Sequence, residues 1–218
     1  MSDERSDQAL LQAHVDGDAD AFGELFARHR NRLWAVALRT MGNPEDAADG
    51  LQDGMIAAFR RAGSYRGEAA VTTWLHRVVV NACLDRIRSA RIRRLEALPD
   101  DVEDRGTVVA TAARDVQPDE VAVDSERRRR VLDALASLPA EQRAALVLVD
   151  MEGYPVAEVA RMLGCAEGTV KSRCSRGRTK LAAMLADLHH PAGDPPHGNP
   201  PPEGPVQPRV RPRGPPAP

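Results

Sequence analysis

Apolar residues recur at helical spacing in two separate blocks of this chain. In the first block, steps of three and four residues place one apolar stripe on a helix from about Asp20 to Thr40, formed by Phe22, Leu25, Phe26, His29, Leu33, Val36 and Ala37. We expect this stripe to be buried. No segment reads as a strand-rich domain, so the pattern predicts an all-α protein made of two small helical domains.

A second helix is predicted directly after the first. Asn43 provides an N-cap, Pro44 suits the first helical position, and acids follow at the positive end of the helix dipole. At about 100° per residue, one side is apolar (Ala47, Leu51, Met55, Ala58 and Ala62) and the other carries Asp46, Asp49, Asp53 and Ile56. This acidic face is either a solvated surface or, because unpaired like charges repel, a docking surface for a basic partner.

The third predicted helix, from about Ala70 to Arg91, has two apolar sides and is therefore expected to pack between neighbours. One side carries Val71, Trp74, Leu75, Val78 and Ala82, and the other Val80, Cys83, Leu84 and Ile87. Its end and the turns that follow are rich in arginine: Arg86, Arg88, Arg91, Arg93 and Arg94. Such a cluster suits a phosphate backbone, or else it only complements the helix dipole.

The second block predicts a helix-turn-helix. A helix that starts with a Ser137 cap and Pro139 stops at Gly153, and two short helices follow, Val156 to Leu163 and about Glu167 to Leu185. Ala160, Gly164 and Val170 supply the small crossing residue, the turn glycine and the apolar anchor. The last helix turns Val170, Cys174, Gly177 and Leu181 inward, while Lys171, Ser172, Ser175 and Arg176 point away, flanked by Arg173 and Arg178. Cations and hydroxyls without an acid suit a groove-reading helix better than a solvated one.

Composition sets the limits of these blocks. We expect a first domain at residues 6–95, a flexible acidic linker at 96–126, a second domain at 127–188 and a disordered proline-rich tail at 189–218. The formal net charge of -2 hides local basic and acidic clusters, so local charge matters more than the total. The three cysteines have no zinc spacing, and no carboxylate or histidine set forms a catalytic site, so we expect no cofactor, no metal and no enzymatic activity. The polar start and the absence of a long apolar run predict a cytoplasmic protein.

Three motifs resemble the extracytoplasmic-function (ECF) sigma factors of the sigma-70 family. GTVKSRCSRGRTKL, at 168–181, is similar to the −35 recognition helix of region 4. NPEDAADGLQDGMIAAFR, at 43–60, resembles the region 2 helix that docks on core RNA polymerase, and RGEAAVTTWLHRVVVNACLDRIR, at 66–88, resembles the segment that melts and reads the −10 element. The details of both blocks are most similar to the sigma-M subgroup. Motifs from two regions in the family's order are more specific than either alone.

The resemblance implies roles for residues of this chain. Core polymerase, through its beta-prime clamp helices, would be held by Asp46, Asp49, Gln52, Asp53 and Ile56. The −10 DNA would be bound by Arg60, Arg61, Trp74, Arg77, Asn81, Asp85, Arg88 and Arg91, with a flipped base in the Ser64 to Ala70 loop. The −35 DNA would be bound by Thr169, Lys171, Ser172, Arg173, Ser175, Arg176 and Arg178. The implied partners are core polymerase (including its beta flap), promoter DNA and an anti-sigma factor, without membrane insertion.

Two features depart from the family pattern. Gly50 and Gly54 stand where larger aliphatic residues are usual, and each is expected to weaken the docking helix by about 1 kcal/mol relative to alanine. Cys174 replaces a common leucine of the recognition helix. The alternative function is a helix-turn-helix regulator that binds DNA without polymerase and uses the first block for sensing or dimerisation.

Overall fold

The computed structural model describes residues 5–96 and 120–186, and the regular structure within these two ranges is helical throughout. The first range forms α1 (Asp7–Val15), α2 (Ala21–Met41), α3 (Pro44–Arg61), the 3-10 turn η1 (Ala62–Ser64) and α4 (Val71–Glu96). The second forms α5 (Glu120–Ala136), α6 (Ala140–Leu146), the π-helical turn η2 (Val147–Met151), α7 (Val156–Leu163) and α8 (Glu167–Met184). The predicted all-α class is confirmed; the proline-rich tail and most of the predicted linker lie outside the described residues.

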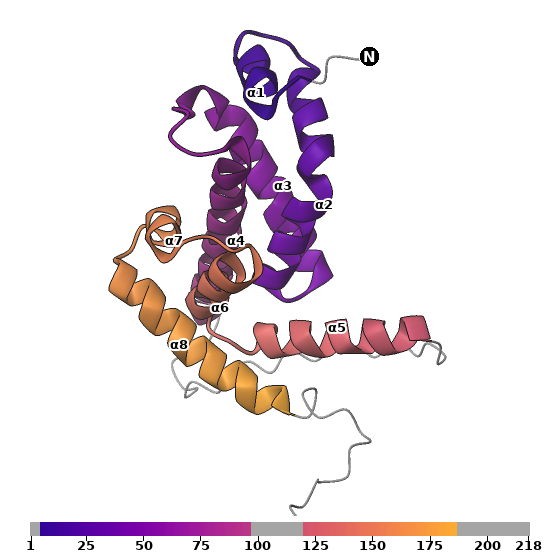
Figure 1. The fold of residues 1–218 in the computed structure, drawn as a ribbon, viewed down its shortest axis with the longest axis vertical. Coiled ribbons are helices and arrows are strands. Elements are labelled where there is room, and N and C mark those ends of the chain that lie inside the picture. Colours follow the sequence, from indigo (N-terminus) through magenta and orange to yellow (C-terminus); the bar gives the residue numbers. More distant parts are fainter. Residues whose placement is uncertain (1–4, 97–119, 187–218) are drawn as a thin grey trace, which may run out of the picture.

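Helices α2, α3 and α4 form the bundle of the first block, with α1 across one end (Figure 1). The stripe predicted for α2 is largely buried, with Leu25, Leu33 and Val36 almost completely enclosed. The predicted start of α3 is also confirmed, because the Asn43 side chain accepts a hydrogen bond from the Asp46 backbone N–H at 2.8 Å. Gly42 separates the two helices with a left-handed backbone (φ 87°), which a residue with a Cβ rarely adopts.

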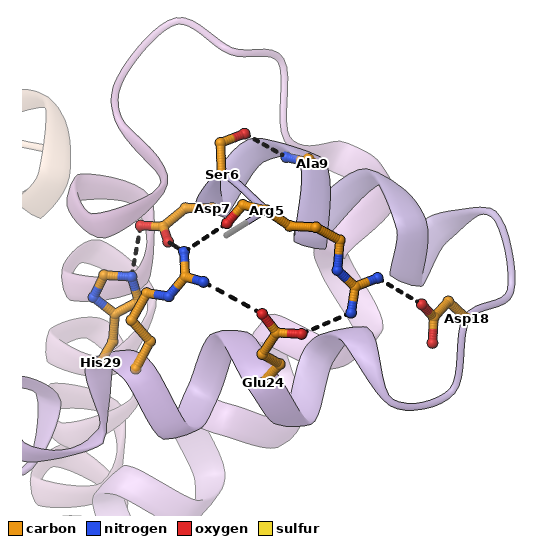
Figure 2. Close-up of polar contacts among 8 residues, drawn as sticks. Arg5, Ser6, Asp7, Ala9, Asp18, Glu24 and His29 are labelled. Atoms are coloured by element: carbon orange, nitrogen blue, oxygen red, sulfur yellow. Dashed lines mark hydrogen bonds and ion pairs between the residues drawn. The ribbon is translucent and has the colours of Figure 1, made fainter. Parts of the chain in front are cut away.

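A polar network fastens α1 to α2 (Figure 2). The Arg5 guanidinium binds Asp18 at 2.9 Å and Glu24 at 2.7 Å. Asp7, at the start of α1, accepts a bond from Arg28 at 2.8 Å and is paired with His29 at 2.6 Å. Beneath this network Leu10 and Leu11 are buried in the bundle core. Apolar burial thus supplies most of the docking energy of α1, and the ion pairs fix its orientation.

Helices α3 and α4 approach each other closely at two glycines. A Cβ added to Gly54 would lie 2.9 Å from the Cα of Val79, and one added to Gly50 would lie 2.8 Å from the Sγ of Cys83. Both distances are shorter than real Cβ contacts. The sequence-based expectation that these glycines only weaken α3 is therefore incomplete, because they also make the close packing of α3 against α4 possible.

Helix α4 packs on two sides, as its sequence predicts. Val79 and Cys83 belong to the core shared with α1, α2 and α3, whereas Val80 and Leu84 belong to a second core built mainly by α5 to α8. Helix α4 therefore contributes to both hydrophobic cores. Figure 1 shows α6 and α7 beside it.

The start of the second block differs from the prediction in two places. Helix α5 begins at Glu120, inside the segment assigned to the linker from its acidic composition. Helix α6 begins at Ala140 after Pro139, and Ser137 does not cap it, because the Ser137 hydroxyl donates to the Ala134 carbonyl at 2.6 Å. Ser137 therefore satisfies the end of α5 rather than the start of α6.

Candidate polymerase and promoter surfaces

The acidic face of α3 is exposed along its length. Asp46, Asp49, Gln52, Asp53 and Ile56 are all solvent-exposed, and Ala47, Leu51 and Ala58 on the opposite side are buried. Two carboxylates of this face are paired, however, whereas the sequence had suggested a face of unpaired acids. The Arg86 guanidinium of α4 binds the carboxylate of Asp49 and, at 3.2 Å, that of Asp53. Arg86 therefore neutralises part of the acidic face instead of standing free for DNA.

An exposed aromatic residue extends this face and was missed by sequence reasoning. The Phe59 side chain is 51% exposed and lies on α3 three residues after Ile56, which is 41% exposed. The ring of His14 packs against Phe59 with centroids 4.4 Å apart. The spacing of Ile56 and Phe59 in the sequence could have predicted this, because residues three apart on a helix are neighbours. Ile56 and Phe59 give the acidic face an apolar end, which is typical of protein docking surfaces.

Part of the predicted −10 set lines a cleft of about 340 Å³. Its walls come from the loop before α4, from α4 itself and from α7, and the lining residues include Tyr65, Arg66, Trp74, Arg77 and Arg161. The Tyr65 and Trp74 rings meet edge to face with centroids 5.9 Å apart. An indole, a phenol and nearby guanidinium groups are the chemistry that receives an unstacked base and its phosphate.

The other predicted −10 residues are spread over a wider surface. Arg60 and Arg61 are exposed at the end of α3 and do not line this cleft. On α4, Arg88 is bound to Asp85 at 2.9 Å and lies 3.8 Å from Glu141, while Arg91 is exposed. The Asn81 amide donates to the Arg77 carbonyl at 2.8 Å and to the Met162 carbonyl of α7 at 3.0 Å. Asn81 therefore faces α7 in this structure.

The helix-turn-helix has the predicted geometry. Ala160 and Val170 are buried, and Gly164 ends α7 with φ 62°. On α8, Val170, Cys174 and Gly177 face the core. A Cβ added to Gly177 would lie 2.5 Å from a methyl group of Leu146, so Gly177 lets α8 cross α6 closely. The assignment of the inward face of α8 is confirmed.

The outward face of α8 is cationic and open, with one exception. Lys171, Ser175 and Arg176 are exposed, and Thr169, Ser172 and Arg173 are partly exposed. Arg178 instead makes a two-point ion pair with Asp150 of η2, at 3.0 and 2.6 Å. Its sequence neighbours on α8 gave no sign of this carboxylate, which lies 28 residues earlier. Arg178 is thus paired with a carboxylate of its own domain although its side chain remains 57% exposed, and Arg176 is exposed as well.

The buried cysteines are poorly suited to thiolate chemistry. Burial raises the pKa of the Cys83 thiol to about 12, and it also raises the pKa of Cys174. Among the residues that the structure describes, no group of three or more His, Cys, Asp or Glu side chains could hold a metal ion. None of the described helices combines the length and apolarity needed to cross a membrane.

Known families match both blocks of the chain. The model of sigma-70 region 2 matches residues 25–93, and the model of sigma-70 region 4 matches residues 128–181. The chain is 52% identical to the ECF RNA polymerase sigma factor SigM of Mycobacterium tuberculosis over 188 residues, which cover 85% of this chain and 88% of that protein. The chain therefore belongs to the ECF sigma factors of the sigma-70 family.

Solved structures agree with this assignment. The fold resembles the sigma factor RpoE in complex with the anti-sigma factor NepR from Bartonella quintana, with a TM-score of 0.57 and 25% identity over 77% of this chain and 98% of that one. It also resembles CnrH in complex with the cytosolic domain of CnrY, with a TM-score of 0.55 and 27% identity over 84% and 99% of the two chains.

The class of activity follows from the family. The protein is a non-enzymatic ECF sigma factor that directs RNA polymerase to promoters. Sigma factors bind core RNA polymerase and anti-sigma factors. The family assignment removes the alternative of a regulator that binds DNA independently of polymerase, because the chain is a sigma factor.

Proposed function

We propose that the exposed face of α3 binds the clamp helices of the beta-prime subunit through Asp46, Asp49, Gln52, Asp53 and Ile56. The single observation that carries this proposal is the alignment of these side chains on one exposed strip, with a bundle core behind them. A strip of one charge sign favours a basic partner and steers its approach. Phe59 extends the strip with apolar area for the same partner.

The promoter contacts are divided between the two blocks. Trp74, Arg77 and the Ser64 to Ala70 loop form the base-receiving part of the −10 surface, and Arg60, Arg61, Asn81, Asp85, Arg88 and Arg91 contact the flanking strand. Lys171, Ser172, Arg173, Ser175 and Arg176 enter the major groove at the −35 element together with Thr169, and Arg178 supports them through Asp150.

The domain limits proposed from sequence complete this scheme. Residues 6–95 act as region 2, 96–126 as a tether, 127–188 as region 4, which also contacts the beta flap, and 189–218 as an appended tail. Two modest DNA contacts joined by a tether bind better than either alone, because the second contact forms at high effective concentration. An anti-sigma factor is a further partner, and its site would overlap the Ile56 and Phe59 patch. Since polymerase and promoter DNA are its partners, the chain would act in the cytoplasm.

The test is co-purification of core polymerase with the full chain. Asp49→Arg with Asp53→Arg should abolish recovery of the beta-prime subunit, and Asp49→Asn with Asp53→Asn should reduce it without adding positive charge. Asp133→Arg with Glu96→Arg is the matched control, because both residues are exposed and lie off the strip. Equal recovery with the reversed and control variants would overturn the proposed docking face.

A further inference from the structure

The cleft of about 340 Å³ beside α4 has walls from both blocks of the chain. The loop before α4 and the first turns of α4 form one wall, and Glu158, Arg161 and Met162 of α7 form the other. Figure 1 shows α7 beside α4. The volume lies in the lower part of the range for pockets that hold small molecules. The proposed promoter contacts include none of the three α7 residues, so the second wall has no role in them.

Five charged side chains line this cleft: Arg66, Glu68, Arg77, Glu158 and Arg161. Within the part of the chain that the structure describes, none of them makes an ion pair. Opposite charges that surround one cavity without reaching each other keep their hydrogen-bonding capacity for a third group. Guanidinium groups bind phosphate through paired N–H donors, and carboxylates accept from amino and hydroxyl groups. Three cations against two acids favour an anionic ligand that also carries donors.

Two aromatic side chains give the cleft a surface for a planar ring. The Tyr65 and Trp74 rings are partly buried and meet edge to face, with centroids 5.9 Å apart. The Tyr65 hydroxyl donates to the Ala69 carbonyl at 2.6 Å, which fixes the loop that carries the ring. Nucleobases of every kind stack on such rings. The aromatic surface and the guanidinium groups together match the two halves of a nucleotide.

The α7 wall is held at a fixed place. The Asn81 amide of α4 donates to the Met162 carbonyl at 3.0 Å, and the Met162 side chain is buried. Arg161, next to it, is exposed and lines the cleft opposite Arg77. A ligand between the two helices therefore meets a guanidinium group from each block. A nucleotide within a strand must also place its neighbours on both sides, whereas a free mononucleotide ends at its phosphate and suits a site with two walls.

We infer that this cleft binds a free nucleoside monophosphate. The base lies on Trp74 and Tyr65, the phosphate lies between Arg77 and Arg161, and the two carboxylates accept from an amino group of the base or from the ribose hydroxyls. The inference depends on the lining of the cleft and does not require that Trp74 and Arg77 contact −10 DNA. Because the ligand touches α4 and α7, it stabilises the arrangement in which they face each other. The nucleotide concentration of the cell is then a signal that this sigma factor can read.

Isothermal titration calorimetry on the full chain tests the ligand class. The probe is adenosine 5′-monophosphate (AMP), and the comparators are adenosine, which lacks the phosphate, and inorganic phosphate, which lacks the base. AMP should bind with a Kd of about 0.1 mM or tighter, and each comparator should bind about ten-fold or more weakly, since neither reaches both halves of the cleft. Absence of AMP binding, or equal affinity for AMP and adenosine, would overturn the inference.

Two variants test the two walls. Arg77→Gln removes a guanidinium group from α4 and Arg161→Gln removes one from α7, and each should weaken AMP binding by about ten-fold because one charge-assisted contact is lost. Arg30→Gln is the matched control, since Arg30 is an exposed arginine of α2 that does not line the cleft. Circular dichroism checks that the variants fold, which their exposed positions favour. Parent-like AMP affinity of the Arg161→Gln chain would show that α7 is not part of the site.

The same variants separate a free nucleotide from a promoter strand. Holoenzyme binding of a labelled −10 single strand should be equal for the parent and Arg161→Gln chains, because the proposed promoter contacts do not include Arg161. Loss of strand binding in parallel with AMP binding would mean that the cleft serves DNA, and the free nucleotide would be ruled out. A chain that binds AMP as expected but gives no promoter-dependent transcription with core polymerase would contradict the proposed function and leave the nucleotide site standing.

Discussion

Gly54 of α3 lies against the backbone of Val79 of α4, with room for a hydrogen atom and not for a methyl group. Helix propensity and packing predict opposite effects on stability when Gly54 is replaced by alanine. Propensity favours alanine by about 1 kcal/mol in a helix interior. The contact requires the two helices to move apart if a Cβ is added, because its nearest neighbour is backbone and not the end of a flexible side chain.

We therefore expect Gly54→Ala to destabilise region 2 by about 1–3 kcal/mol. Gly23→Ala on α2 is the matched control, since an added Cβ there meets nothing within 4 Å and the propensity gain should appear alone. Urea unfolding followed by circular dichroism measures both. Stabilisation by Gly54→Ala similar to that by Gly23→Ala would show that α3 and α4 are not in close contact.

The pairing of Arg178 with Asp150 predicts unequal roles for two arginines of the recognition helix. Arg176→Ala should lower the slope of log K against log salt by about 1 for holoenzyme binding to a promoter fragment, because one phosphate or base contact is lost. Arg178→Ala should change that slope clearly less, since its charge is already matched by Asp150. Fluorescence anisotropy over a range of salt concentrations gives the slopes. Asp150→Asn would remove the partner of Arg178. Equal salt slopes for the Arg176→Ala and Arg178→Ala chains would refute the unequal roles of the two arginines.

His76 makes the stability of the chain dependent on pH. Burial lowers its pKa from 6.5 to about 4; Arg32 and His29 act in the same direction, and Glu152 opposes them, while Tyr154 bonds to its Nδ1. Its Nε2 has no hydrogen-bond partner among the described residues. As the pH falls, His76 is protonated in the unfolded chain before it is protonated in the folded chain. The contribution of the neutral ring to the free energy of unfolding is therefore fully present above pH 6.5 and is lost between pH 6.5 and 4.

At pH 5 the expected loss from this ring is on the order of 2 kcal/mol. The urea midpoint of the parent chain should fall over this range, and that of His76→Asn should fall less. Parallel pH profiles for the two chains would mean that His76 does not set this dependence.

Arg86 predicts an electrostatic effect on polymerase docking. Arg86→Gln removes the cation that partly neutralises Asp49 and Asp53, so the acidic face becomes more negative. Association with core polymerase should become faster at low salt and more dependent on salt, by up to a few-fold in rate. Stopped-flow association with labelled core measures this. Arg93→Gln is the control, since Arg93 is exposed near the end of α4. A slower rate for Arg86→Gln would instead mean that Arg86 positions the two carboxylates.

Local features of this protein were predictable and long-range ones were not. The buried stripe of α2, the Asn43 cap and the Ala160, Gly164 and Val170 turn are set by residues a few positions apart, where helical periodicity and backbone preference act directly. The bond from Arg86 to Asp49 joins residues 37 positions apart, and the bond from Arg32 to Glu152 joins residues 120 positions apart. No period in the sequence relates such pairs.

The candidate site shows the same division. Sequence reasoning placed the acidic face on the exposed side of α3 and the cations on the outward side of α8, because a helix fixes which residues share a face. It did not find Asp150 as the partner of Arg178 or Arg86 as the partner of Asp49 and Asp53, because these partners come from other helices. Phe59 was not predicted as part of this face, although it follows Ile56 by three residues and helical spacing alone places the two side by side.

The π turn at Val147–Met151 holds one more residue than an ordinary helical turn. Asp150 within it binds the recognition helix, and Glu152 directly after it binds region 2. Deleting a single residue there would rotate everything that follows by about 100° relative to α6. Both attachments would be lost together, so this short segment should tolerate substitution far better than any change in length.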